Sequence, residues 1–148
     1  MADVHDVAAT VLELHGRPMS TMKLQKLVYY SQAWHLAWTN RALFDDQIEA
    51  WANGPVTVSL YRHHRGEFEV AVWPLGDSGR LSTSESAVVK TVVETYGPLS
   101  SRVLSDQTHR EDPWRLARGP SKAGERSDAQ ISPVVMRDYY QSIPRTAS

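Results

Sequence analysis

The chain has 148 residues, which corresponds to about one domain. Sixteen basic and seventeen acidic side chains leave a formal net charge of −1, which argues against a strongly basic nucleic-acid-binding protein. The sequence contains no Cys, and this excludes disulfides, thiolate zinc sites and cysteine nucleophiles. Because it has neither a leader pattern nor an apolar run long enough for a membrane span, we expect a single-domain cytoplasmic protein.

Two helices are predicted at the start of the chain. Apolar residues recur at helical spacing over residues 3–15, and the Gly and Pro in residues 16–18 are typical of a helix end. Ser20 or Thr21 is placed to cap a second helix, which runs to about Trp38. Apolar and aromatic residues surround much of this second helix, so we expect it to be central and packed on more than one side.

A small β element is predicted in the middle of the chain. Residues 47–52 alternate weakly and residues 67–73 alternate clearly between apolar and polar, so we expect them to be partner strands. Between them, residues 53–55 predict a turn, and Pro55 is expected at the first position of a helix that runs to about residue 65.

The second half of the chain is predicted to be helical. Ser82 and Glu85 have the spacing of a capping box, in which each side chain satisfies a free backbone donor at a helix start. This helix is expected to end at residues 97–98, a Gly-Pro pair. Shorter helices are expected at about residues 101–106, 112–116 and 132–140.

Two polar segments are expected to be irregular. Residues 118–130 are almost all polar, Gly or Pro, which predicts a mobile loop, and residues 142–148 are expected to form a disordered tail. The predicted fold for residues 1–148 is therefore a single, compact, mainly α domain with a small two- or three-stranded β element.

Two histidine-containing segments are candidates for chemistry. His63 and His64 are neighbours on a predicted helix and point about 100° apart, so they do not chelate one metal ion from one face. We expect a solvated helix end there and no metal site. In residues 108–114, His109 and Glu111 have the residue types of a general base and its orienting carboxylate.

The alternative for residues 108–114 is a structural or recognition elbow anchored by Trp114. This interpretation is preferred because no nucleophile or metal-ligand set accompanies the segment at a fixed spacing. The chain is rich in Trp and Tyr, which fill cores and also dominate protein interfaces. Too few basic residues are interleaved with them for a nucleic-acid-binding face, so we expect no nucleic acid partner for this chain alone.

Four segments, in order, resemble the Panacea domain, the SocA-like antitoxin family that includes phage-associated GepA proteins. They are residues 23–37, 43–61, 81–114 and 131–140, and the resemblance covers about residues 5–141. One departure is Asn53, because family members often carry an aromatic residue beside the Gly of the Gly-Pro-Val turn. Asn tolerates turn geometry, so the turn itself is still expected.

The resemblance implies an antitoxin that binds a co-encoded toxin protein and holds it inactive, without catalysis, metal or other cofactor. The candidate toxin-binding residues are Trp51, Tyr61, Thr108, His109, Glu111 and Trp114. The residues expected to maintain the fold are Lys26, Tyr30, Trp34, Gly54, Pro55 and Pro113. Two alternatives stay open: a hydrolase or nucleotide-binding enzyme that uses His109 and Glu111, and a phage-derived regulator that binds a host protein. The state of self-association and the identity of the toxin stay open as well.

Overall fold

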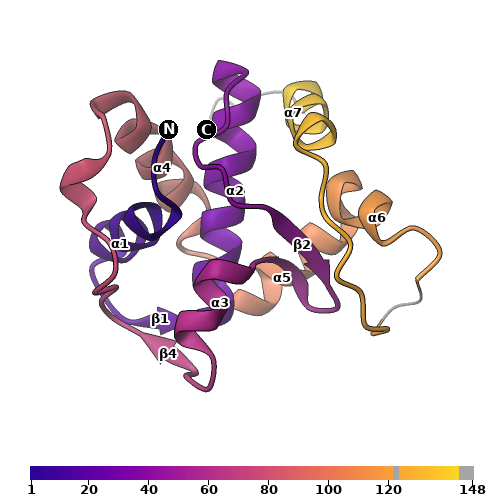
Figure 1. Ribbon diagram of the computed structural model, residues 1–148, viewed down its shortest axis with the longest axis horizontal. Coiled ribbons are helices and arrows are strands. Elements are labelled where there is room, and N and C mark those ends of the chain that lie inside the picture. Colours follow the sequence, from indigo (N-terminus) through magenta and orange to yellow (C-terminus); the bar gives the residue numbers. More distant parts are fainter. Residues whose placement is uncertain (122–123, 144–148) are drawn as a thin grey trace.

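The computed structural model describes residues 1–121 and 124–143. This part of the chain is mainly helical, as predicted, with a small amount of β structure (Figure 1). The helices are α1 (Val4–His15), α2 (Thr21–Thr39), α3 (Val58–His64), α4 (Thr83–Tyr96), α5 (Ser101–Arg110), α6 (Asp112–Arg118) and α7 (Pro133–Ser142), with one 3₁₀ turn at Ser78–Arg80. The strands are β1 (Met19–Ser20), β2 (Ile48–Trp51), β3 (Gly54–Thr57) and β4 (Glu69–Val70). No helix in the described ranges is both long and apolar enough to span a membrane.

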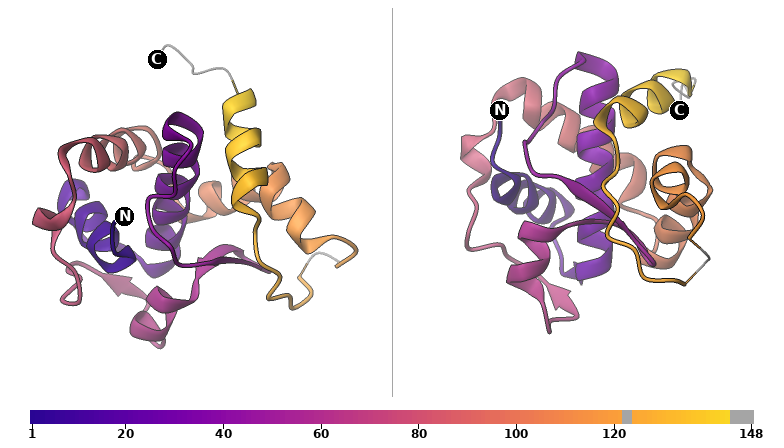
Figure 2. Two further views of the ribbon diagram at one scale, coloured as in Figure 1. Left: turned by 45° about the horizontal axis from the view of Figure 1, so that its top comes forward. Right: turned by 45° about the vertical axis from the view of Figure 1, so that its right-hand side comes forward.

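Helix α2 is the central element, as its apolar circumference predicted. Ser20 caps its N-terminus by accepting a hydrogen bond from the backbone N–H of Lys23. Helices α1 and α4 pack on one side of α2, and α5 and α7 pack elsewhere around it (Figures 1 and 2). Strands β1 and β3 also contact α2. The result is a helix whose side chains are buried around most of its circumference.

The strand pairing differs from the prediction. Strands β2 and β3 form an antiparallel hairpin, whereas β4 pairs with β1 in a second two-stranded sheet. Residues 67–73 are therefore not the partner of residues 47–52, and only Glu69–Val70 is a strand. The alternation of residues 67–73 does not follow burial either, because Phe68 and Val72 are exposed and only Val70 and Trp73 are buried.

Pro55 lies in strand β3, opposite Ala50, and not at the start of a helix. The backbone N–H of Ala50 donates to the carbonyl of Ala129, on the side away from β3. Ala50 and Pro55 therefore form a non-hydrogen-bonded pair, in which a strand residue needs no N–H toward its partner. Helix α3 begins three residues later, at Val58.

The segment predicted to be a mobile loop, residues 118–130, is held at both ends. Arg118 is buried and donates to the carbonyl of Ala50. Residues 129–131 bond to the open edge of β2, because Ile131 N–H also donates to the carbonyl of Ile48. An unpaired strand edge offers such partners to a polar segment. Of the predicted tail, residues 144–148 lie outside the described residues, and Ser142 ends α7.

The helical half otherwise follows the sequence signals closely. Ser82 and Glu85 form the predicted capping box, with both reciprocal hydrogen bonds present. Helix α5 is longer than predicted, because it continues to Arg110. The residue between α5 and α6 is Glu111, which is the N-cap of α6. The two helices are thus joined by one extended residue, which makes the elbow predicted at residues 108–114 a sharp one.

Candidate functional site

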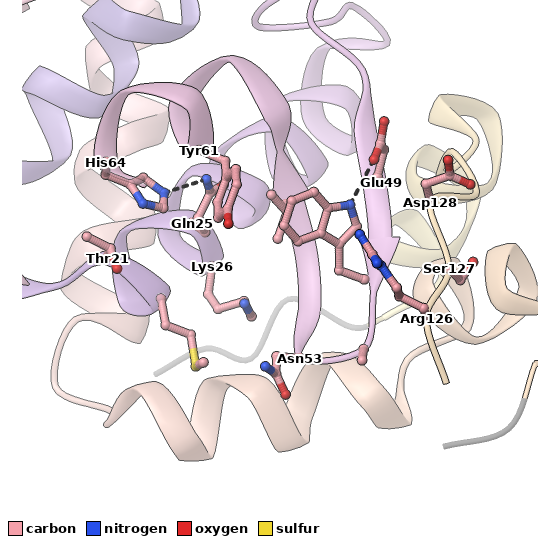
Figure 3. Close-up of a pocket in the computed structure, with 14 residues that line it drawn as sticks. Thr21, Gln25, Lys26, Glu49, Asn53, Tyr61, His64, Arg126, Ser127 and Asp128 are labelled. Carbon is pink, nitrogen blue, oxygen red and sulfur yellow. Dashed lines mark hydrogen bonds between the residues drawn. The ribbon is translucent and has the colours of Figure 1, made fainter. Parts of the chain in front are cut away.

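A cleft of about 770 Å³ lies between α2, α3, the β2–β3 hairpin and residues 126–128. This volume is within the range of about 300–1,000 Å³ typical of ligand sites. Figure 3 shows Gln25 and His64 on one side of the cleft and residues 126–128 on the other, with Lys26 between them. The surface of the cleft is largely apolar, with a few polar groups from each of these elements.

Trp51 and Tyr61 form one wall of the cleft. Both side chains are half-buried, and the edge of one ring faces the other, with the ring centroids 4.8 Å apart. The indole N–H of Trp51 donates to Oε1 of Glu49 at 2.8 Å, which fixes the orientation of the indole. The structure therefore brings together two of the candidate binding residues and holds them in a defined geometry.

Lys26 forms the floor of the cleft. Its side chain is 1% exposed, and it makes no ion pair or hydrogen bond with any residue in 1–121 or 124–143. Burial lowers the pKa of the Lys26 ammonium from 10.5 to about 7, because the charged form loses its hydration without gaining a counter-charge. An uncompensated buried cation of this kind is costly for a fold to keep.

The absence of a side chain at Gly54 leaves space for the end of the Lys26 side chain. It has a φ of +124°, and a Cβ at this position would lie 2.4 Å from Cε of Lys26 and 3.2 Å from Oγ1 of Thr108. A side chain at Gly54 would therefore be strained by its backbone conformation and would also collide with the lysine. The Gly-Pro turn predicted from the sequence thus serves to let Lys26 pass beneath the hairpin.

Gln25 and His64 form a hydrogen-bonded pair beside the lysine. The Gln25 amide bonds both backbone groups of Thr57, through its oxygen at 2.9 Å and its nitrogen at 3.2 Å. The same nitrogen donates to Nε2 of His64 at 2.9 Å, so this ring nitrogen is an acceptor and the ring is neutral. Burial, and to a smaller extent the Lys26 charge, lower the pKa of His64.

The elbow at residues 108–114 holds the hairpin that carries Trp51. The indole N–H of Trp114 donates to the carbonyl of Trp51 at 2.9 Å. His109 stacks on the Trp114 ring with centroids 4.1 Å apart. Ser105 Oγ donates to the carbonyl of Asn53 at 2.6 Å. Trp114 and its neighbours therefore act on the cleft wall through the backbone of the β2–β3 turn.

His109 itself does not line the cleft. Its Nε2 is buried and has no hydrogen-bond partner among the described residues. Burial is the main cause that lowers the pKa of His109, and the nearby Lys26 charge contributes. The charge of the same ammonium thus lowers the pKa of both His64 and His109.

Two candidate residues of the elbow lie inside the fold. Thr108 is completely buried, and its hydroxyl donates to the carbonyl of Ser105. Glu111 is buried, and its Oε1 accepts hydrogen bonds from Tyr30 at 2.7 Å and from Tyr140 at 2.8 Å. Burial raises the pKa of Glu111 despite these two bonds. Neither side chain presents a polar group to the cleft.

The histidine pair on α3 differs from its prediction. His64 is 5% exposed, so this end of α3 is only partly solvated. The reason is that Gln25 on α2 provides a buried hydrogen-bond partner for the ring. His63 is exposed and its ring packs edge-on against Trp73, at 4.7 Å between centroids. No group of three or more potential metal ligands occurs among the described residues.

Sequence reasoning assigned Lys26 to the scaffold and did not select Gln25, His64 or Arg126 as cleft residues. One signal was present: Lys26 lies between Leu24 and Leu27 on a helix predicted to be buried on most sides. A lysine in such a helix usually extends its ammonium to solvent, so the sequence alone does not indicate a buried charge.

Comparison with known proteins decides the family. A family model described as the antitoxin SocA-like Panacea domain matches residues 24–115. The chain belongs to this family. No curated protein and no solved structure matches the chain.

The matched part of this Panacea domain runs from the first turn of α2 into α6. It contains the whole β2–β3 hairpin, Lys26 and the elbow. The cleft residues 126–128 lie outside it, as do α1 and α7. Most of the cleft is therefore built by the matched region, with Thr21, Met22 and residues 126–128 added from outside it.

The remaining residues expected to maintain the fold lie in the packed interior or in its turns. The Tyr30 ring stacks on Tyr96 with centroids 4.1 Å apart. The indole N–H of Trp34 donates to the hydroxyl of that same tyrosine at 2.8 Å. Pro113 lies in the first turn of α6, where a missing N–H costs nothing. Together with Glu111, these aromatic residues tie α2, α4 and α7 to the elbow.

Proposed function

We propose that this protein is a cytoplasmic antitoxin that neutralises a co-encoded toxin by binding it directly. Membership of the antitoxin family supports the general role. The observation that carries the proposal is the half-buried pair of Trp51 and Tyr61, held rigidly at the wall of an apolar cleft. Tyr and Trp in such positions are the residues that most often dominate binding energy at protein interfaces.

The proposed mechanism is steric. A preformed face that includes the cleft covers the active site or substrate entry of the toxin, and no bond is made or broken. A stable interface of this kind buries about 1,600 Å² in total. The hydrogen bonds from Trp51 to Glu49 and from Trp114 to the hairpin backbone reduce the side-chain entropy that is lost on binding.

Within this proposal, the six candidate residues have three roles. Trp51 and Tyr61 contact the toxin. His109 and Trp114 position the hairpin, while the buried Thr108 and Glu111 support the elbow from within. A partner therefore contacts Trp51 and Tyr61, which this packing holds in place, and not the side chains of Thr108 and Glu111.

The alternative enzyme has less support from the geometry. A general base needs access to its substrate, whereas Glu111 is buried and bonded to two tyrosines. Neither His109 nor Glu111 lines the cleft. A regulator of a host protein would use the same face as an antitoxin, so only the partner distinguishes those two functions.

The test uses the purified product of the adjacent open reading frame. We expect the wild-type chain to bind it, and Trp51→Ala to weaken the affinity by at least about tenfold. Leu14→Ala is the matched control, because Leu14 is a partly exposed apolar residue on α1 that does not line the cleft. Co-expression with the toxin should show the same order in growth rescue. Equal affinity and equal rescue by all three chains, each folded by circular dichroism, would refute the surface assignment.

A further inference from the structure

The floor of the cleft contains an amine for whose charged form the described fold provides no counter-charge. Lys26 is almost completely buried, has no carboxylate partner in residues 1–121 and 124–143, and lines the cleft. Figure 3 shows its side chain extending into the space between α2 and the hairpin. If this position only had to fill space, Met or Leu would do so without burying a charged group. The presence of an ammonium therefore indicates that it binds a ligand.

We propose that the cleft binds an acidic side chain, Asp or Glu, of the toxin, whose carboxylate pairs with the ammonium of Lys26. This inference rests on the proposed function and names the chemistry of its central contact. The apolar part of the acidic side chain and its neighbours in the toxin pack against Trp51 and Tyr61. The carboxylate reaches the floor, where Asn53 provides an additional polar group.

The charges around the cleft favour one carboxylate over a phosphate. The lining contains two cationic side chains, Lys26 and Arg126, and two acidic ones, Glu49 and Asp128. A dianionic phosphate is normally held by several cations or by a set of backbone N–H groups. Here one buried ammonium faces a largely apolar space, which fits a single negative charge on a short carbon chain.

The fold keeps this ammonium in place. Gly54 leaves room for the end of the lysine side chain, and a Cβ there would lie 3.0 Å from Nζ. The ionisable side chains that surround Lys26 are His64 and Tyr61 on α3, His109 on α5, Glu49 on β2, and Arg126 and Asp128 on the segment before α7. The two histidines have lowered pKa values, so both are neutral near pH 8.

Binding of the carboxylate is therefore coupled to protonation of Lys26. The free lysine has a pKa of about 7, so near pH 8 about nine tenths of the molecules carry it neutral. A paired carboxylate favours the charged form. Complex formation near pH 8 should take up close to one proton at this residue, whereas near pH 6 it should take up almost none.

The experiment is calorimetry of toxin binding near pH 8 in two buffers with different ionisation enthalpies. The probe is the purified product of the adjacent open reading frame. We compare wild type with Lys26→Met and Lys26→Gln, and we use Lys90→Met, which removes an exposed lysine on α4, as the charge-matched control. Circular dichroism establishes that each variant is folded.

We expect Lys26→Met and Lys26→Gln to bind about 10- to 100-fold more weakly and to lose the proton uptake of close to one, while Lys90→Met behaves as wild type. If wild type and Lys26→Met bind with equal affinity and equal proton uptake, the inference is wrong and the proposed function stands. The proton uptake of wild type is a test in itself. If it is near zero at both pH values, the inference is wrong, whatever the variants show. No binding by wild type overturns the proposed function and the inference together.

Discussion

Replacing the buried lysine at the floor of the cleft by methionine should stabilise the protein in a pH-dependent manner. Lys26 and Met have similar volume, so Lys26→Met removes the charge and leaves the packing nearly intact. The gain arises because wild type keeps an ammonium in a place where it has no counter-charge. Such a gain would mean that the lysine is retained for binding and not for stability.

The magnitude follows from the pKa of Lys26, which burial lowers from 10.5 to about 7. Because the folded pKa lies below the unfolded one, the unfolded chain binds more protons at this residue between these two pH values. Wild-type stability therefore rises with pH through this window. This pKa difference of about 3.5 lowers the free energy of unfolding of wild type by about 5 kcal/mol below pH 7. The advantage of Lys26→Met should shrink by about 3 kcal/mol between about pH 6 and pH 9.

The assay is urea unfolding of both chains at these two pH values, followed by circular dichroism. His64 and His109 occur in both chains, and most of their contribution cancels because burial, which Lys26→Met leaves nearly unchanged, is the main cause of their lowered pKa values. Lys90→Met, which removes an exposed charge, should differ from wild type by less than about 0.5 kcal/mol at either pH. A difference between wild type and Lys26→Met that stays constant with pH would refute the reasoning, as would a less stable variant near pH 6.

Three further substitutions test the packing around the site. Gly54→Ala should lower the free energy of unfolding by about 2 kcal/mol or more in a denaturant titration, because it introduces strain and a collision with the lysine; wild-type stability would contradict the described geometry. Tyr140→Phe should cost about 1–3 kcal/mol, because it removes one of the two hydrogen bonds to the buried Glu111; a neutral effect would show that this bond is unimportant. Ser82→Ala should cost about 1 kcal/mol through loss of the capping box, whereas Ser84→Ala should cost less; equal thermal midpoints for the two variants would contradict the assigned cap.

Local signals in the sequence predicted most of the helical fold. The caps at Ser20 and Ser82 act on neighbouring backbone groups, and both were found where the spacing placed them. The all-round apolar character of residues 21–39 likewise predicted a central helix. Each of these features depends on residues within one or two turns, which is why a sequence pattern is enough to find them.

Contacts between residues far apart in the sequence could not be predicted from such local signals. A turn was predicted at residues 53–55, but Pro55 lies in a strand and is tolerated there because the register of β2 and β3 places it in a non-hydrogen-bonded pair. The aromatic pair Trp51 and Tyr61 was selected as a binding surface, whereas the buried ammonium beside it was not. Burial of Lys26 depends on α2, the hairpin and α5 together, and no local pattern contains that information.

The central claim is that this protein acts by binding a toxin and not by turnover. The most direct test titrates a fixed amount of the purified toxin with the antitoxin and measures residual toxin activity in a cell-free assay. We predict a linear loss of activity that ends at an equimolar ratio, with the end point shifted to a large excess for Trp51→Ala. Complete and lasting inactivation by substoichiometric wild-type protein would contradict the claim.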